Sequence, residues 1–151
     1  MWFLLSSSGL GESLVGKNVG FLGLGRIGLA IAKRLKPFGI GKVYYTNRTC
    51  NPEAEREVDI TYKREKKRIK RTSFPTPYVK VGAERLELQD LAAESDIVVV
   101  TASLSESTRH IVNREFLARM RSSSYLVNVA RGGLVDQEAL LASLQSGGNN
   151  K

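Results

Sequence analysis

The sequence predicts an α/β fold with a doubly wound parallel sheet, and three patterns support this fold class. Glycines at Gly23, Gly25 and Gly28 separate an apolar run from a helical pattern. Residues 96–100 hold a continuous β-branched run, which is typical of a strand buried on both faces of a parallel sheet. Strand and helix patterns alternate along most of the chain, and such alternation produces parallel sheets.

The first half of the chain predicts a strand, a helix and a second strand. We expect the first strand at residues 17–22, where apolar residues lead into the glycines. A helix at 26–36 follows, because apolar residues recur every four positions from Ile27 and Pro37 then ends the pattern. Residues 42–46 are rich in valine and tyrosine and predict the second strand.

The second half continues the alternation. We expect a short third strand at 85–88, a short helix at 89–94, and strands at 96–100 and 125–130. Asn113 is the expected N-cap of a helix that reaches about residue 120. Asp136 is the expected N-cap of a helix that ends near residue 147.

Composition places the chain among single-domain proteins of a reducing compartment. The 151 residues suffice for one domain, and the single cysteine, Cys50, excludes a disulfide framework. The apolar start, residues 1–5, is too short for a signal-peptide core, and no run approaches the roughly 20 apolar residues of a membrane span. We therefore expect a cytoplasmic protein that does not contact a membrane.

The net charge of +8 is concentrated in one segment, residues 57–80. Eight basic residues face one acidic residue, Glu65, between positions 60 and 80. This segment has no clean periodicity, and we expect a disordered basic insertion. It is either a genuine insertion or foreign sequence such as a translated intron. Nucleic-acid binding or nuclear import through its basic run at residues 63–71 is the less favoured interpretation, because only Tyr62 and Phe74 lie close to that run for base stacking.

The glycine pattern predicts a Rossmann-like dinucleotide site. Gly23 permits the tight turn off the strand, Gly25 lets the backbone approach a pyrophosphate, and Gly28 lets the helix pack closely on the strand. The start of the helix offers free N–H groups and a partial positive charge to the phosphates. The alternative is a tight strand–helix turn that binds no ligand.

The end of the second strand predicts which dinucleotide is bound. Domains of this kind that bind NAD carry a carboxylate about 20 residues beyond the glycines, where it accepts hydrogen bonds from the ribose. Here that place holds Asn47, Arg48 and Thr49, which include no carboxylate. An arginine offers a 2′-phosphate a charged fork of donors, so we expect NADP to be preferred over NAD. The alternative is that Arg48 is a solvated surface charge.

Several blocks together resemble the nucleotide-binding domain of the D-isomer-specific 2-hydroxyacid dehydrogenases, above all the glyoxylate/hydroxypyruvate reductases. The glycine motif runs on into a helix that ends Leu-Lys-Pro-Phe-Gly, as it does in those reductases. Further matching blocks lie at residues 91–96, 107–113 and 128–136. The resemblance covers residues 10–56 and 81–147, so we assign residues 10–147 to an NAD(P)-binding domain.

The resemblance implies roles for individual residues. Arg131 matches the family's catalytic arginine, which grips the carboxylate and α-carbonyl of a 2-keto acid such as glyoxylate or hydroxypyruvate. Ser103 matches a cofactor-contacting position, and Arg26 and Ile27 match residues whose backbone meets the pyrophosphate. No metal ligand is implied. A structural arginine at a strand end is the alternative for Arg131.

The resemblance also implies that parts of the family's full chain are absent. Its catalytic glutamate and histidine follow the arginine block, whereas His110, the only histidine here, matches a mainly structural position. We expect the sheet to be incomplete, the substrate domain to be missing, and the isolated chain to be an inactive fragment. By analogy the protein would form a homodimer. The alternatives are a non-catalytic dinucleotide-binding protein of the corepressor type and an inactive truncated remnant.

Overall fold

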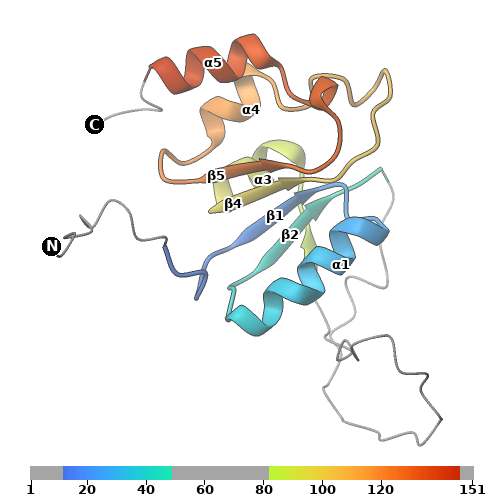
Figure 1. The fold of residues 1–151 in the computed structure, drawn as a ribbon, viewed down its shortest axis with the longest axis vertical. Helices are drawn as coiled ribbons and strands as arrows, with labels where there is room; N and C mark the ends of the chain where they lie inside the picture. Colours follow the sequence, from blue (N-terminus) through green and yellow to red (C-terminus); the bar gives the residue numbers. More distant parts are fainter. Residues whose placement is uncertain (1–11, 49–81, 147–151) are drawn as a thin grey trace, which may run out of the picture.

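The computed structural model describes residues 12–48 and 82–146, which form a parallel sheet flanked by helices (Figure 1). Residues 57–80, for which we expect a disordered basic insertion, lie outside the described residues. Thr49 and Cys50 lie outside them as well. The elements in chain order are β1 (Val19–Leu22), α1 (Arg26–Leu35), η2 (Lys36–Phe38), β2 (Val43–Thr46), β3 (Ala83–Arg85), α3 (Leu88–Glu94), β4 (Ile97–Val100), α4 (Arg114–Arg119), β5 (Tyr125–Asn128), η3 (Gly132–Leu134) and α5 (Gln137–Gln145).

The five strands lie in the order β3-β2-β1-β4-β5, and every neighbouring pair is parallel. Val19 at the centre pairs with Val43 of β2 on one side and with Ile97 of β4 on the other. The strand order therefore reverses direction between β1 and β4. In open α/β sheets such a switch point leaves a crevice at the carboxyl ends of the two strands. The fold confirms the predicted doubly wound α/β class.

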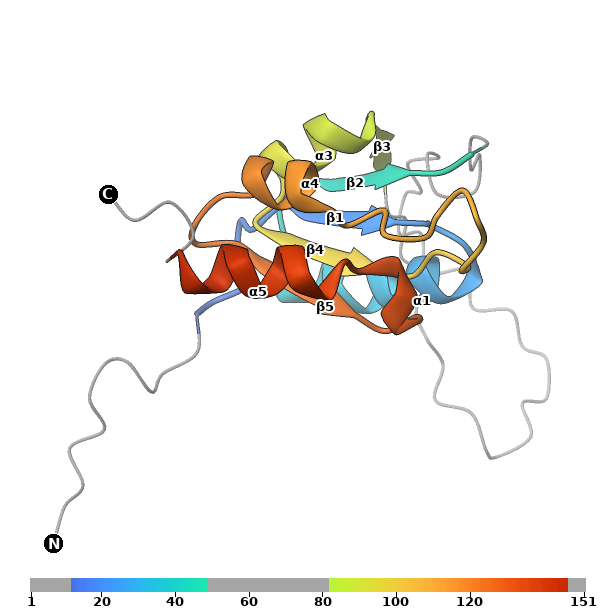
Figure 2. The same cartoon turned by 90° about the horizontal axis from the view of Figure 1, so that it is seen from above.

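Helices cover both faces of the sheet, and each face has its own core. Phe21 and Tyr45 pack with Leu29 of α1 in one core. Tyr44 and Val98 belong to the other core, which also holds buried residues of α3, α4 and α5. Figure 2 shows α5 in front of the sheet and α1 on its far side. Because side chains alternate along β2 and β4, each of these strands contributes to both cores.

Two helix starts form as the sequence predicts. The side chain of Asn113 accepts a hydrogen bond from the backbone N–H of Phe116 at 2.9 Å, and α4 follows. The side chain of Asp136 accepts one from the N–H of Ala139 at 3.0 Å, and α5 follows. Each cap satisfies an amide that the first helical turn leaves without a partner.

The prediction of a strand at 85–88 was wrong in its position. The strand occupies Ala83–Arg85, and Glu87 already serves as the extended N-cap of α3. Leu86 and Leu88 pack against the core beneath α3 instead of extending the sheet. Residues 85–88 therefore hold a strand end followed by a helix start. In the described part of the chain, no helix is long and apolar enough to span a membrane.

Candidate dinucleotide-binding site

A pocket of about 610 Å³ opens where the carboxyl ends of β1, β2 and β4 meet. It lies at the switch point of the sheet, where the strand order predicts a ligand crevice. The residues that line it come from the ends of these three strands and from the loops that follow them: Leu22, Gly23, Gly25, Thr46, Asn47, Arg48, Thr101, Ala102, Ser103, Ser105, Thr108 and Ile111. The structure thus brings together five of the residues predicted from the sequence: Gly23, Gly25, Asn47, Arg48 and Ser103.

Close packing explains two of the three loop glycines. Gly23 has φ +92°, and a Cβ there would lie 2.7 Å from the Cα of Ala102. A Cβ on Gly28 would lie 2.9 Å from the carbonyl oxygen of Gly23 and 2.9 Å from Oγ1 of Thr101. Thr101 also donates its hydroxyl to that same carbonyl of Gly23. The turn and the helix–strand contact therefore both require glycine, whether or not a ligand binds.

Gly25 has no such internal reason to be glycine. It is the N-cap of α1 with φ −87°, and a Cβ there would have no described atom within 4 Å. Within the described residues no side-chain hydrogen bond caps the helix, so its first amide groups are left without a capping partner. Arg26 is exposed, and Ile27, unusually for its type, is 65% exposed. Open space, free amides and a helix N-terminus together suit a phosphate group.

Asn47 ties the end of β2 to the glycine loop. Its Oδ1 accepts a hydrogen bond from the backbone N–H of Leu24 at 2.6 Å, and its Nδ2 donates to the carbonyl of Leu24 at 3.5 Å. The side chain therefore holds the loop between Gly23 and Gly25 from the side. A carboxylate could accept the first of these bonds but could not donate the second.

Arg48 extends along the wall of the pocket. Its Nη2 donates to Oγ of Ser107 at 3.1 Å, which connects the loop after β2 to the loop after β4. The neighbouring strand contributes Arg85, whose Nη2 donates to the carbonyl oxygen of Asn47 at 3.1 Å. Both arginine side chains are exposed, and none of the described residues that line the pocket carries a carboxylate. Arg48 therefore places a positive charge on this wall of the pocket.

The loop after β4 is built from hydroxyl groups. Oγ1 of Thr108 accepts from the backbone N–H of Ser105 at 2.8 Å and donates to the carbonyl of Ser103 at 2.7 Å. Oγ of Ser105 lies 3.1 Å from Oγ of Ser107. These contacts hold the loop in one turn, and Ser103 stands exposed at its start, on the wall of the pocket.

Arg131 follows β5 at the same edge of the sheet but is not among the residues that line the pocket. Its side chain is exposed, and its Nη1 donates to the carbonyl of Ala130 at 3.1 Å. Asn128 orders the turn: its Nδ2 donates to the carbonyl of Arg131 at 3.0 Å, and its Oδ1 accepts from the N–H of Ala130 at 3.0 Å. These bonds fix the backbone around Arg131, and its guanidinium group is open to solvent.

His110 lies in the loop after β4 and is exposed. Its φ of 52° is left-handed, and its backbone N–H donates to the carbonyl of Gly133 at 2.9 Å. Within the described ranges, its ring makes no hydrogen bond to a carboxylate. The contact joins this loop to η3, which agrees with a structural role for the residue.

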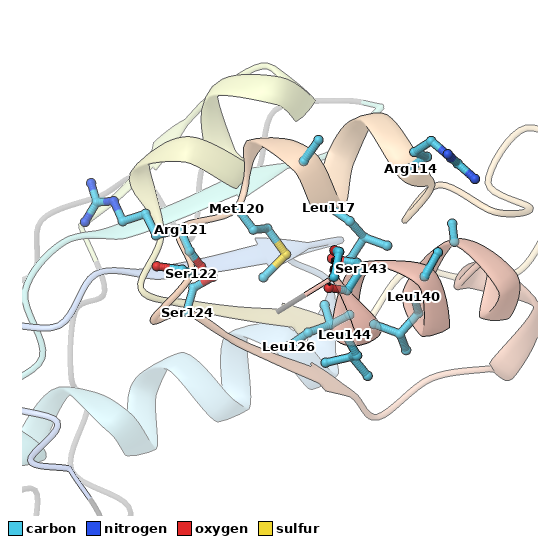
Figure 3. A pocket seen from close by; sticks show the side chains of 14 residues that line it. Arg114, Leu117, Met120, Arg121, Ser122, Ser124, Leu126, Leu140, Ser143 and Leu144 are labelled. Atoms are coloured by element: carbon cyan, nitrogen blue, oxygen red, sulfur yellow. Dashed lines mark hydrogen bonds between the residues drawn. The ribbon is translucent and has the colours of Figure 1, made fainter. Parts of the chain in front are cut away.

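A second pocket, of about 560 Å³, lies away from these residues between α4, β5 and α5. Leucine side chains from all three elements, Leu117, Leu126 and Leu140, line it together with Met120 (Figure 3). None of the described residues that the sequence predicts to bind cofactor or substrate lines this pocket. Residues 12–48 and 82–146 also contain no group of three His, Cys, Asp or Glu side chains that could hold a metal ion.

The comparison with known families decides what kind of domain this is. The chain matches the model of the D-isomer specific 2-hydroxyacid dehydrogenase, NAD binding domain, over residues 2–76 and 68–150. The chain belongs to this family.

Relatives with assigned names agree with the family. The chain is 38% identical over 138 residues to a glyoxylate reductase of Thermococcus onnurineus, which covers 91% of this chain and 34% of the relative. It is 36% identical over 137 residues to the glyoxylate reductase/hydroxypyruvate reductase of Homo sapiens, covering 91% and 35%. The chain therefore spans about a third of the length of the 2-hydroxyacid dehydrogenases that it matches.

Solved structures of the family share the fold. The NAD-complexed D-isomer specific 2-hydroxyacid dehydrogenase from Lactobacillus delbrueckii ssp. bulgaricus superposes with a TM-score of 0.71 at 28% identity, covering 97% of this chain and 37% of that one. A glyoxylate reductase from Paecilomyes thermophila gives 0.69 at 33% identity, covering 92% and 35%. The strand order and the flanking helices of this chain are thus those of a 2-hydroxyacid dehydrogenase nucleotide-binding domain.

Sequence reasoning missed three residues that shape this edge of the sheet, where the candidate site lies. Thr101 binds the carbonyl of Gly23, Arg85 binds the carbonyl of Asn47, and Asn128 binds the carbonyl of Arg131. All three act on backbone groups. Thr101 and Asn128 stand at or just beyond a strand end, where parallel strands bring polar groups to one edge, so their position was a usable signal. The position of Arg85 at a strand end was not recognised, because the third strand was predicted to begin at that residue.

Proposed function

We propose that this chain supplies the cofactor-binding half of an NADP-dependent reductase that converts a 2-keto acid, glyoxylate or hydroxypyruvate, to its 2-hydroxy acid. One observation carries the choice of cofactor: Arg48 lines the pocket at the end of β2, beside the neutral Asn47. The substrate class comes from relatives that are named glyoxylate reductase and hydroxypyruvate reductase.

The residues of the pocket fit a dinucleotide. Gly25 leaves open space in front of the uncapped start of α1, so the amides of Arg26 and Ile27 would hold the pyrophosphate. Ser103, across the pocket, would contact the cofactor beyond the pyrophosphate. When bound, the cofactor supplies the hydride, and the protein's own part is to bind and orient it.

Charge at the end of β2 supports NADP over NAD. None of the described residues that line the pocket is acidic, so none of them would repel a 2′-phosphate or accept hydrogen bonds from a ribose diol as a carboxylate does. Arg48 offers a planar set of donors that matches phosphate geometry. The side chain would exchange its bond to Ser107 for the phosphate, and Thr49, next in the chain, would add a hydroxyl donor.

Arg131 is proposed as the catalytic residue that holds the substrate. Its exposed guanidinium is always charged, and the Asn128 turn fixes its backbone. It would grip the carboxylate of the 2-keto acid and polarise the adjacent carbonyl toward hydride attack.

Reduction also needs a proton donor, and His110, without an orienting carboxylate in the described ranges, is a poor one. We therefore expect the isolated 151-residue chain to bind NADPH without reducing hydroxypyruvate.

The test of this proposal is Arg48→Ala with both cofactors titrated against the full chain. Loss of a charge-assisted contact should weaken NADPH binding by about 10-fold or more and leave NADH binding within about 2-fold. Arg119→Ala, an exposed arginine on α4, controls for the lost positive charge. Unchanged NADPH affinity in Arg48→Ala would refute the cofactor assignment.

The expected homodimer and the cytoplasmic location remain predictions. Sedimentation equilibrium of the chain, with and without NADPH, measures the first directly. A single monomeric species across the concentration range would contradict it.

A further inference from the structure

Arg85 is the last residue of the edge strand β3, and its side chain reaches across to the end of β2. It pairs in register with Tyr45, and its Nη2 donates to the carbonyl oxygen of Asn47 at 3.1 Å. That carbonyl belongs to the peptide group that joins Asn47 to Arg48. The guanidinium of Arg85 therefore helps to fix the peptide from which the Arg48 side chain projects.

Asn47, whose carbonyl Arg85 binds, is also tied to the glycine loop through its side chain. The side chain of Asn47 binds both backbone groups of Leu24, at 2.6 and 3.5 Å, so the glycine loop and the end of β2 move together. Arg85 completes this link by connecting the edge of the sheet to the same residue. A continuous set of contacts thus runs from β3 through Asn47 to the loop around Gly25.

Glu84, which precedes Arg85 in β3, makes its ion pair elsewhere. Successive residues of a strand face opposite sides of the sheet, and Glu84 pairs with Lys42, 3.9 Å away at the start of β2. Arg48 lines the pocket and none of the described residues that line it is acidic, so this wall of the pocket carries positive charge. This placement would serve an anion better than a neutral ribose.

We propose that Arg85 is a positioning residue for the 2′-phosphate of the dinucleotide, acting through Arg48. This inference rests on the proposed preference for NADP. Arg85 fixes the Asn47–Arg48 peptide before any ligand binds. Arg48 therefore loses less conformational entropy when its side chain closes on a phosphate, and the binding free energy retains more of the contact energy. The competing role is purely structural, in which Arg85 only ties the edge strand to the sheet.

The test compares two probes that differ by the 2′-phosphate, 2′,5′-ADP and 5′-AMP, titrated calorimetrically against the full chain. Arg85→Met should weaken binding of 2′,5′-ADP by about 5- to 10-fold and leave 5′-AMP within about 2-fold. Arg85→Lys keeps a charged donor and should recover part of the loss. Arg119→Met is the matched control, because it removes an exposed arginine on α4 and should change neither probe.

A double-mutant cycle separates action through Arg48 from direct contact with the phosphate. In the Arg48→Ala background, Arg85→Met should have little further effect on 2′,5′-ADP. An undiminished effect there would overturn the proposal, because Arg85 would then act on its own. Thermal unfolding of each variant shows whether the fold is intact, and Arg85→Lys keeps the test valid if Arg85→Met unfolds.

Two further outcomes are distinguishable. If Arg85→Met weakens both probes equally, or neither, Arg85 is structural and this inference fails while the proposed function stands on the Arg48→Ala result. If the unaltered chain binds 2′,5′-ADP no better than 5′-AMP, the proposed cofactor preference fails, and this inference fails with it.

Discussion

Gly25 and Gly28 lie in the same loop, yet an added Cβ would meet very different surroundings at the two positions. At Gly25 no described atom lies within 4 Å, whereas at Gly28 the carbonyl oxygen of Gly23 and Oγ1 of Thr101 lie at 2.9 Å. Gly25→Ala should therefore affect the ligand and spare the fold, and Gly28→Ala should affect the fold first. Gly132, which also has open space and lies outside the pocket, provides the matched control.

The contacts around each added Cβ determine how much stability each substitution should cost. Overpacking at Gly28 costs about 1–3 kcal/mol, and the better helix propensity of alanine offsets about 1 kcal/mol of it. The net loss of up to about 2 kcal/mol would lower Tm by up to about 8 °C for a chain of this size. At Gly25, the smaller entropy of the unfolded chain and the poorer N-cap nearly cancel, so stability should stay within about 1 kcal/mol. The new methyl group would stand where a pyrophosphate approaches.

Urea unfolding and calorimetric titration with NADPH measure the two effects separately. Gly25→Ala should weaken NADPH binding by about 10-fold or more with an unchanged unfolding midpoint. Gly132→Ala should change neither quantity. Wild-type affinity in Gly25→Ala would refute the reasoning, because the open space at Gly25 would then have no ligand to explain it.

Three further changes test the packing around the site. In Gly20→Ala the new Cβ would lie 2.2 Å from Oγ of Ser95, so the free energy of unfolding in urea should fall by about 1–3 kcal/mol, and adding Ser95→Ala should recover part of it. Asp136→Ala removes the cap of α5 and should lower stability by about 1 kcal/mol; an unchanged value would mean that the cap contributes nothing. Arg121→Met breaks the ion pair between the exposed Arg121 and the half-buried Asp96 and should lower the free energy of unfolding by less than about 1 kcal/mol, so a larger loss would contradict the solvent screening of this pair.

Local patterns sufficed to predict most of the fold. The run at residues 97–100, the four-residue repeat in α1 and the caps at Asn113 and Asp136 are all set by neighbours within one turn or strand. The same holds for the glycine turn, because φ +92° at Gly23 and the close contact at Gly28 depend on the strand–helix junction. These features were therefore visible in the sequence.

Contacts between distant segments could not be predicted in this way. Asn47 was expected near the cofactor, but its side chain binds Leu24, and that contact depends on how β2 lies beside β1. The bonds from Arg48 to Ser107 and from Arg85 to Asn47 likewise join segments that only the sheet brings together. The sequence pattern shows which residue types lie at an edge of the sheet. The register of the strands decides which groups each of these residues contacts.

The most direct test of the central claim is a calorimetric titration of the unaltered chain with NADPH and with NADH. The account predicts that both bind at one site and that NADPH binds about 10-fold more tightly or better, since a phosphate held by an arginine contributes about 1.5–3 kcal/mol. Equal affinities would contradict the role of Arg48, and no binding of either cofactor would contradict the site itself.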